Sequence, residues 1–258
     1  MDQDETNLRG LFVKAIIEVR NLIKRFGHKQ VLRKLNFSVQ QGEFVALLGS
    51  NGAGKTTLLR ILSSLSKPNY GEIQIAGYYL PGQAAQVRKK LGVVSHLPLL
   101  YGDLSAEENL KFYGRLYGLS DFQNHIEEIL QLVGLLKRKK DLVRTFSRGM
   151  QQRLAIGRAI IHDPEVLLLD EPHTGLDQDA ANMLDTLLQE IASRGRTVVM
   201  TSHDFPRVAN LATRFDVLYK GKIHSSKLAK DLPQHGLLAY YQSIVDEIDT
   251  GGGIQDAA

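Results

Sequence analysis

The 258-residue sequence contains no cysteine, so no disulfide framework is available to it. It also lacks an apolar run of bilayer-spanning length. The longest runs, such as those at residues 44–48 and 166–169, have the length of single strands, whereas a spanning helix needs about 20 residues. The first ten residues, MDQDETNLRG, are acidic and do not follow the pattern of a signal peptide. These absences suit a reducing compartment and predict that any role at a membrane is that of a peripheral subunit.

Charge of either sign is in small excess only. The formal net charge is +4 and the isoelectric point is near 9.1, and a balance this weakly basic does not by itself indicate a nucleic-acid or membrane-surface partner. Hydrophobic residues make up 43% of the chain, which is ordinary for a globular core. The length fits one large domain, or a core domain with a small subdomain.

Short apolar segments alternate with helical patterns along most of the chain. The predicted strands cover residues 16–22, 35–39, 44–48, 72–76, 91–95, 166–169, 197–200 and 215–219. The predicted helices between them cover residues 55–64, 180–193 and 204–212. Strands that alternate with helices indicate an α/β domain with a mostly parallel sheet.

Residues 97–160 are helical in pattern and resemble an insertion into this domain. Ser105 and Glu108 have the spacing of a capping box. Two apolar helical faces follow, one formed by Leu110, Tyr113, Leu116 and Tyr117 and the other by Ile126, Ile129, Leu130 and Val133. We expect a flexible leader at residues 1–15, the core domain at 16–226, and a C-terminal extension at 227–258. The extension is expected to hold a short amphipathic helix over 237–248 and to be disordered from Thr250 onward.

A glycine-rich loop follows the apolar segment 44–48 and precedes a predicted helix. It matches the pattern G-x-x-x-x-G-K-[ST] with the residues Gly49, Ser50, Asn51, Gly52, Ala53, Gly54, Lys55 and Thr56. Backbone N–H groups of such a loop surround phosphate oxygens, Lys55 reaches the β- and γ-phosphates, and the Thr56 hydroxyl coordinates Mg²⁺. The predicted fold is therefore a P-loop nucleotide hydrolase core with a mostly parallel sheet, an antiparallel β edge and an inserted α-helical subdomain.

Two acidic residues, Asp170 and Glu171, end the apolar strand at 166–169. A carboxylate at the tip of a buried strand is costly without a partner, and Mg²⁺ is a natural one. We expect Asp170 to hold the metal through water and Glu171 to act as the general base for the attacking water. A nucleotide kinase has less use for such a base than a hydrolase has, so the pair favours ATP hydrolysis.

At this point the chain resembles the ATP-binding subunits of ABC transporters. The segment 145–153, TFSRGMQQR, is similar to the family signature L-S-G-G-Q followed by Q-R. Phe146, Arg148 and Met150 depart from it, while Ser147 and Gly149 match. The resemblance implies that Ser147 and Gly149 hold the γ-phosphate of ATP bound to the opposite subunit of a head-to-tail dimer. Without the resemblance, Ser147 is simply the N-cap of a helix.

Three more positions match the family in order along the chain. Asp177, in the segment EPHTGLD, is implied to lie at the dimer seam, and His203 is implied to sense the γ-phosphate. Phe26 lies where the family places an aromatic ring that stacks on adenine, although it could instead be a core residue. With Thr57 added, the predicted ATP-binding set is Phe26, Gly49, Ser50, Asn51, Gly52, Ala53, Gly54, Lys55, Thr56, Thr57, Ser147 and Gly149, and the predicted catalytic set is Glu171, His203 and Lys55.

His96 departs from the family at a functional position. The family has glutamine at the end of the strand before the helical insertion, where it contacts Mg²⁺ and the attacking water and couples the site to the membrane subunit. Imidazole has different geometry and becomes half-charged near pH 6.5. We therefore expect activity below about pH 6.5 to fall more steeply than in a His96→Gln variant; matching pH profiles would count against this.

The resemblance spans residues 16–226 and implies an ATPase that uses ATP and Mg²⁺. The implied partners are a separate integral membrane transporter subunit and a second copy of this chain, at the cytoplasmic face of the inner membrane. Details of the helical region are most similar to the haem exporter of cytochrome c biogenesis, which would add haem-handling membrane proteins. Drug or polysaccharide exporters are the alternative. A nucleic-acid-associated ABC ATPase is disfavoured because there is no long heptad run, and an inactive regulatory subunit is disfavoured because Lys55, Ser147, Glu171 and His203 are present.

Overall fold

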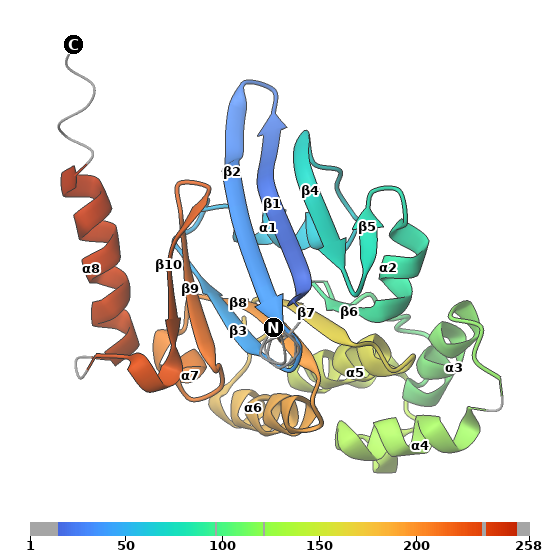
Figure 1. Cartoon of the computed structure of the whole chain (residues 1–258). Coiled ribbons are helices and arrows are strands. Elements are labelled where there is room, and N and C mark those ends of the chain that lie inside the picture. Colours follow the sequence, from blue (N-terminus) through green and yellow to red (C-terminus); the bar gives the residue numbers. More distant parts are fainter. Residues whose placement is uncertain (1–14, 96, 121, 234–235, 252–258) are drawn as a thin grey trace, which may run out of the picture.

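A computed structural model describes residues 15–95, 97–120, 122–233 and 236–251. Two sheets form its centre (Figure 1). The larger sheet has the strand order β10-β9-β3-β8-β7-β6, and all neighbouring strands are parallel except β10 and β9. Its strands are β3 (Phe44–Leu48), β6 (Leu91–Val94), β7 (Val166–Asp170), β8 (Thr197–Ser202), β9 (Arg214–Tyr219) and β10 (Lys222–Leu228).

The smaller sheet is antiparallel, with the order β2-β1-β4-β5. Its strands are β1 (Ala15–Phe26), β2 (Lys29–Gln40), β4 (Tyr70–Ile75) and β5 (Tyr78–Leu80). One hydrophobic core includes buried residues of this sheet together with Leu58, Leu59 and Leu62 of α1 (Lys55–Leu62) and one face of the larger sheet. Because the glycine-rich loop connects the end of β3 to the start of α1, this packing fixes the position of the loop.

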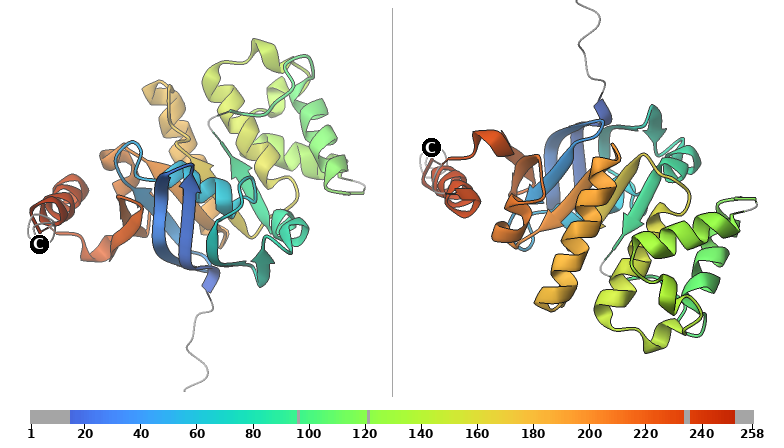
Figure 2. Two further views of the ribbon diagram at one scale, coloured as in Figure 1. Left: turned by 90° about the horizontal axis from the view of Figure 1, so that it is seen from above. Right: turned by 90° about the horizontal axis from the view of Figure 1, so that it is seen from below.

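The other face of the larger sheet is covered by helices. They are α5 (Arg148–Ile160), α6 (Gln178–Ser193) and α7 (Phe205–Ala209), with α3 (Ala106–Leu116) and α4 (Gln123–Leu132) packed on α5. The remaining elements are α2 (Ala84–Lys90), α8 (Gly236–Gly251) and the short 3₁₀ turns η2 (Leu136–Arg138), η3 (Val143–Thr145) and η4 (Ala229–Asp231). The α3–α4 pair and α8 lie at opposite sides of the molecule (Figure 2). Since β3 and β7 are buried along their whole length, their continuous apolar sequences suit a sheet covered on both faces.

The predicted α/β class, with its parallel sheet, antiparallel strands and helical segments, is confirmed. Sequence patterns underestimated β1 and β2, which form a hairpin of two twelve-residue strands. They missed β5, α2 and β10. β10 runs across the predicted boundary between residues 226 and 227. These elements are short or, like β10, expose every second residue to solvent and so lack a marked apolar pattern.

The helical region follows its predicted pattern except in one respect. The Ser105–Glu108 capping box is present, and Ile126, Ile129 and Leu130 are buried as expected. Leu116, however, is 66% exposed and does not continue the buried face of Leu110. The prediction was wrong for Leu116 because α3 ends at this residue, whereas Tyr113 in the same turn still packs on Arg158 of α5.

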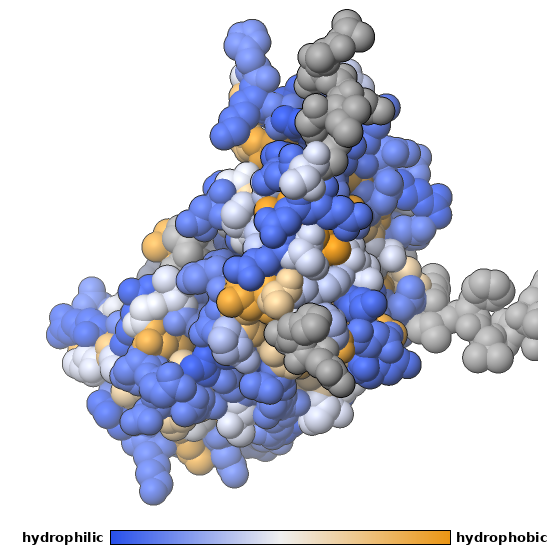
Figure 3. All heavy atoms as spheres, turned by 90° about the vertical axis from the view of Figure 1, so that its left-hand side faces the viewer, coloured by the Kyte–Doolittle hydropathy of each residue, from blue (hydrophilic) through white to orange (hydrophobic). Residues whose placement is uncertain are grey.

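The C-terminal helix α8 lies against α7 and β9. Leu237 and Tyr240 are buried there, and Asp249 accepts a hydrogen bond from the Tyr219 hydroxyl at 2.8 Å. The helix includes Thr250 and reaches Gly251, so the predicted disorder from Thr250 was wrong for these two residues. Mostly hydrophilic residues cover this side of the molecule (Figure 3). In the part of the chain that the structure describes, every helix is too short or too polar to cross a bilayer.

Candidate active site

The glycine-rich loop joins the end of β3 to the first turn of α1. Gly54 caps α1 with φ of 115°, a conformation that strongly favours glycine. A side chain on Gly49 would meet the carbonyl oxygen of Leu218 at 2.4 Å, so the neighbouring strand β9 also requires glycine there. The loop thereby exposes backbone N–H groups at a helix N-terminus, which is favourable for phosphate.

Lys55 lies beneath this loop with only 7% of its side chain exposed. Its Nζ donates a hydrogen bond to the carbonyl oxygen of Gly49 at 2.7 Å and lies 3.8 Å from Oε1 of Glu171. Burial lowers the pKa of Lys55, and the nearby carboxylates of Glu171 and Asp170 oppose this shift. The ammonium group is therefore held between the phosphate loop and the two acids.

Asp170 is buried at the end of β7 and accepts two hydroxyl hydrogen bonds on Oδ1. Thr56 donates one at 3.1 Å and Thr201 donates the other at 2.8 Å. The hydroxyl of Thr56 and the carboxylate of Asp170 thus meet beside the phosphate loop. Oxygen ligands of these two types are what Mg²⁺ uses in nucleotide sites, so the residues present fit that ion.

Glu171 has a left-handed backbone, with φ of 50°. This is uncommon for a residue other than glycine and costs about 1–3 kcal/mol. Its N–H donates to Oγ1 of Thr201 at 3.0 Å, which helps to hold the conformation. The turn directs the carboxylate toward His203, whose Nδ1 lies 2.8 Å from Oε2. A carboxylate placed between an ammonium and an imidazole is suited to accept a proton from water.

A cavity of about 460 Å³ opens in front of these groups. It is lined by Phe26, Lys29, Val31, Ser50, Asn51, Gly52, Gly54, Lys55, Thr56, Thr57 and Glu171. The side chain of Phe26 is 53% exposed at the end of β1, so the alternative role as a core residue is wrong. Among the predicted ATP-binding residues of the loop, Gly49 and Ala53 do not line the cavity, and Ala53 is buried.

The remaining predicted residues lie elsewhere. Ser147 caps α5 and accepts a hydrogen bond from the N–H of Met150 at 3.3 Å. Gly149 packs on α6, where an added Cβ would meet that of Ala180 at 2.6 Å. Asp177 caps α6. None of Ser147, Gly149 and Asp177 lines the cavity, and His96 lies outside the described residues.

Sequence reasoning missed three residues of this site. Thr201 connects Asp170 to Glu171, and Lys29 and Val31 line the cavity opposite the loop. Thr201 had a usable signal, because it lies near the end of β8, two residues before His203. Lys29 and Val31 had none, since only the β1–β2 hairpin brings them to the cavity.

Comparison with known proteins agrees with this geometry. The profile of the family described as "ABC transporter" matches residues 32–174. The linearmycin resistance ATP-binding protein LnrL of Bacillus subtilis is 36% identical, with 84% of this chain and 70% of that protein aligned. The Nod factor export ATP-binding protein I of Burkholderia lata is 38% identical, with 87% and 73% aligned.

Among solved structures, a dimeric ATP-binding cassette in a post-hydrolysis state, bound to ADP and Pi, superposes with a TM-score of 0.74. It is 27% identical, and the alignment covers 83% of this chain and 98% of that one. The match to the family profile covers more than half of the chain and contains both the phosphate loop and the Asp170–Glu171 pair. The chain therefore belongs to the ABC transporter family, as one of its ATP-binding and ATP-hydrolysing subunits.

Proposed function

We propose that this chain binds Mg-ATP in the cavity between Phe26 and Lys55 and hydrolyses it to power export by a separate membrane subunit. The observation that carries the proposal is the position of Glu171, which lines the cavity and lies between two basic groups: Nζ of Lys55 is 3.8 Å from one carboxylate oxygen and Nδ1 of His203 is 2.8 Å from the other. Phosphoryl transfer to water needs positioned charges more than covalent chemistry, and this cluster supplies them.

Each residue has a role that its position supports. Phe26 offers a ring face to adenine, and the backbone N–H groups of the loop, with Lys55, bind the phosphates. Thr56 and Asp170 would hold Mg²⁺, which when bound neutralises phosphate charge. Glu171 would take a proton from the attacking water, and His203, at hydrogen-bonding distance, would orient that carboxylate.

Two copies would act head to tail, so that Ser147 and Gly149 of one copy meet the nucleotide of the other. The dimeric state of the relative bound to ADP and Pi supports a dimer of this chain. Asp177 caps a helix next to the same α5 surface, which suits a position at the seam.

The exported compound is inferred from relatives. Haem export, the first expectation, has no support among them, and the named functions are linearmycin resistance and Nod factor export. We therefore propose the alternative hypothesis, that this chain is an ATPase subunit of a drug or polysaccharide exporter. Haem-handling partner proteins are not part of this proposal.

A tagged Glu171→Gln variant tests the proposal. We expect its hydrolysis rate to fall by about 100-fold or more because the general base is lost, while ATP binding persists and an integral membrane protein co-purifies from membranes in mild detergent with Mg-ATP. Lys55→Ala is the matched control, since it should lose ATP binding as well. Purification without any membrane protein would contradict the transporter role. A haem absorption band in the purified complex would contradict the choice of cargo.

A further inference from the structure

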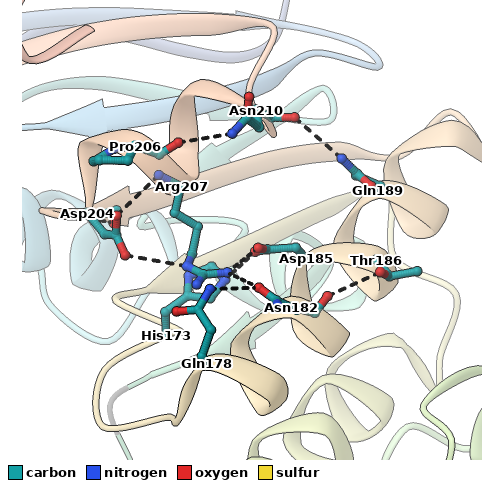
Figure 4. A network of polar contacts seen from close by, with 11 residues as sticks. His173, Gln178, Asn182, Asp185, Thr186, Gln189, Asp204, Pro206, Arg207 and Asn210 are labelled. Carbon is teal, nitrogen blue, oxygen red and sulfur yellow. Dashed lines mark hydrogen bonds and ion pairs between the residues drawn. The ribbon is translucent and has the colours of Figure 1, made fainter.

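Four side chains form a polar network that connects the turn after Glu171 to α6 and to the start of α7. Nε2 of His173 lies 2.7 Å from Oδ1 of Asp185, and the other carboxylate oxygen of Asp185 accepts a hydrogen bond from Arg207. The Nε of Arg207 lies 3.4 Å from Oδ2 of Asp204. Figure 4 shows these side chains converging between the two helices.

Three of the four members are more enclosed than ordinary surface ion pairs, whereas the side chain of Asp204 is 44% exposed. The side chains of His173 and Arg207 are 8% and 11% exposed, and that of Asp185 is 21% exposed. Asn182 lies beside them, with its Oδ1 3.4 Å from an Arg207 nitrogen. The Arg207–Asp185 ion pair resists displacement, because breaking it would leave a largely buried charge unpaired.

Both ends of this polar network lie next to catalytic residues. His173 follows Glu171 by two positions, and Asp204 follows His203 directly. Since Glu171 and His203 are themselves in contact at 2.8 Å, the six residues close a ring. One side of the ring is the Glu171–His203 contact next to the nucleotide cavity. The other side is the polar network of His173, Asp185, Arg207 and Asp204.

The backbone of Glu171 needs such a restraint. Its left-handed conformation is unfavourable for a residue with a side chain, and only surrounding contacts keep it populated. Thr201 holds its N–H from the β8 side. Pro172 is buried directly after it, and the enclosed side chain of His173 then ties the turn to Asp185 of α6.

We propose that His173 and Arg207 are positioning residues for ATP hydrolysis: through Asp185 and Asp204 they hold the turns that carry Glu171 and His203 at a fixed separation. This inference rests on the proposed function. It also gives the segment between Glu171 and Asp177 a second role. If that segment moved at a subunit seam, His173 would transmit the movement through Asp185 and Arg207 to α7, and so to His203.

The protonation state of His173 follows from its surroundings. Burial lowers its pKa, although Asp185 opposes the shift. Nδ1 is buried and has no hydrogen-bond partner among the described residues. We therefore assign the neutral tautomer that carries its proton on Nε2 and donates it to Asp185. A glutamine amide nitrogen can occupy the place of Nε2, whereas leucine fills similar volume without a donor.

The test compares His173→Gln with His173→Leu in the full chain. We expect the leucine variant to lose about tenfold in kcat for ATP hydrolysis, because small misplacements of catalytic groups are costly. Its KM and its affinity for a non-hydrolysable ATP analogue should stay within about twofold of wild type, since the phosphate loop is untouched. The glutamine variant should recover most of the rate.

Arg207 provides an independent arm. Arg207→Met should lower kcat as His173→Leu does. The kcat of the double variant should be little lower than that of the worse single variant, because both changes break the same polar network. Gln189→Ala is the matched control. Its amide also connects α6 to the region of α7, by a 3.4 Å hydrogen bond to the carbonyl oxygen of Asn210, but it touches none of the four residues. Its kcat should be unchanged.

Several results would overturn the proposal. They are an undiminished kcat in His173→Leu, equal losses in the leucine and glutamine variants, or a loss of kcat that is matched by losses of nucleotide affinity and melting temperature. Failure of the proposed function would look different. Wild-type protein without ATPase activity would count against that function, whereas an active wild type with an equally active leucine variant would count against the positioning role alone.

Discussion

The cluster around Glu171 and the N-terminus of α5 differ in how far a single chain completes them. In the cluster, Glu171 contacts both Lys55 and His203, and Lys55 and Glu171 line the cavity. At α5, the hydroxyl of Ser147 caps its own helix and Gly149 packs on Ala180, and neither residue lines that cavity. Both regions are well ordered by local contacts, but only the first surrounds a space for ligand.

This difference gives the two regions separate requirements. The cluster depends on contacts within the chain, so its geometry is set before any partner binds. The α5 N-terminus holds an exposed serine and backbone donors that suit an anion, yet its own chain brings no phosphate site to it. The proposed head-to-tail dimer would remove the discrepancy, because the second copy would present its nucleotide to this surface.

The largest expected effect is that of two variants, each of which disables one of the two regions. Ser147→Asp keeps an N-cap residue but places a negative charge toward the γ-phosphate of the partner's nucleotide. We expect it to reduce hydrolysis by about 100-fold while the isolated chain still binds ATP. Lys55→Ala should lose binding and hydrolysis together. Both are measured by ATPase assay and nucleotide titration.

Mixing these two inactive proteins then tests the trans arrangement. Each mixed dimer would hold one intact site, formed by the Lys55 of one copy and the Ser147 of the other. A 1:1 mixture should recover about a quarter of the wild-type rate, given random pairing and independent sites. Ser147→Asn, a neutral N-cap, is the control for helix stability. A mixture no more active than its components would contradict the head-to-tail dimer that we propose brings the two regions together.

A smaller effect is expected at the adenine side of the cavity. Phe26→Ala should raise the KM for ATP about tenfold, since stacking of a base on an aromatic ring contributes about 1–3 kcal/mol, and it should leave kcat nearly unchanged. Phe26→Tyr keeps a ring face and should behave like wild type. Steady-state kinetics separates the two parameters, and a loss in kcat alone would show that Phe26 acts on the cluster instead.

Local sequence patterns predicted the parts of this site that a single segment determines. The loop from Gly49 to Thr56 and the acids Asp170 and Glu171 follow continuous apolar strands, and the structure places them at one edge of the sheet as those strands require. The capping roles of Ser105 and Ser147 were equally local.

Contacts between distant segments could not be predicted in the same way. The hydrogen bonds of Thr201 to both acids depend on the β7–β8 pairing, and the His173–Asp185 contact depends on how α6 returns along the sheet. The left-handed backbone of Glu171 has no sequence signal, because glutamate rarely adopts it. The prediction of haem as cargo is without support for a related reason: resemblance in the helical region carries no information about the chemistry of the exported compound.

The smallest expected effect concerns the opposite end of α5, where His162 ties this helix to the rest of the molecule. Its ring stacks on Tyr117 with a centroid distance of 3.6 Å, and its Nε2 lies 3.0 Å from the carbonyl oxygen of Leu91. Burial lowers the pKa of His162 to about 4, and the nearby guanidinium groups of Arg196 and Arg158 add to the shift. Nδ1 is buried without a partner among the described residues, so a proton there would be unpaired.

The sign of the pH effect follows from this shift. Between about pH 4 and pH 6.5 the unfolded chain binds a proton at His162 that the folded chain does not, so the free energy of unfolding rises with pH in that window. The contribution is complete above pH 6.5 and is lost as the pH falls toward 4. Thermal melts should therefore show acid destabilisation over this range. His162→Gln, which keeps a donor for Leu91 but cannot titrate, should show a shallower slope; parallel slopes would mean that other groups dominate and that α5 is anchored independently of this histidine.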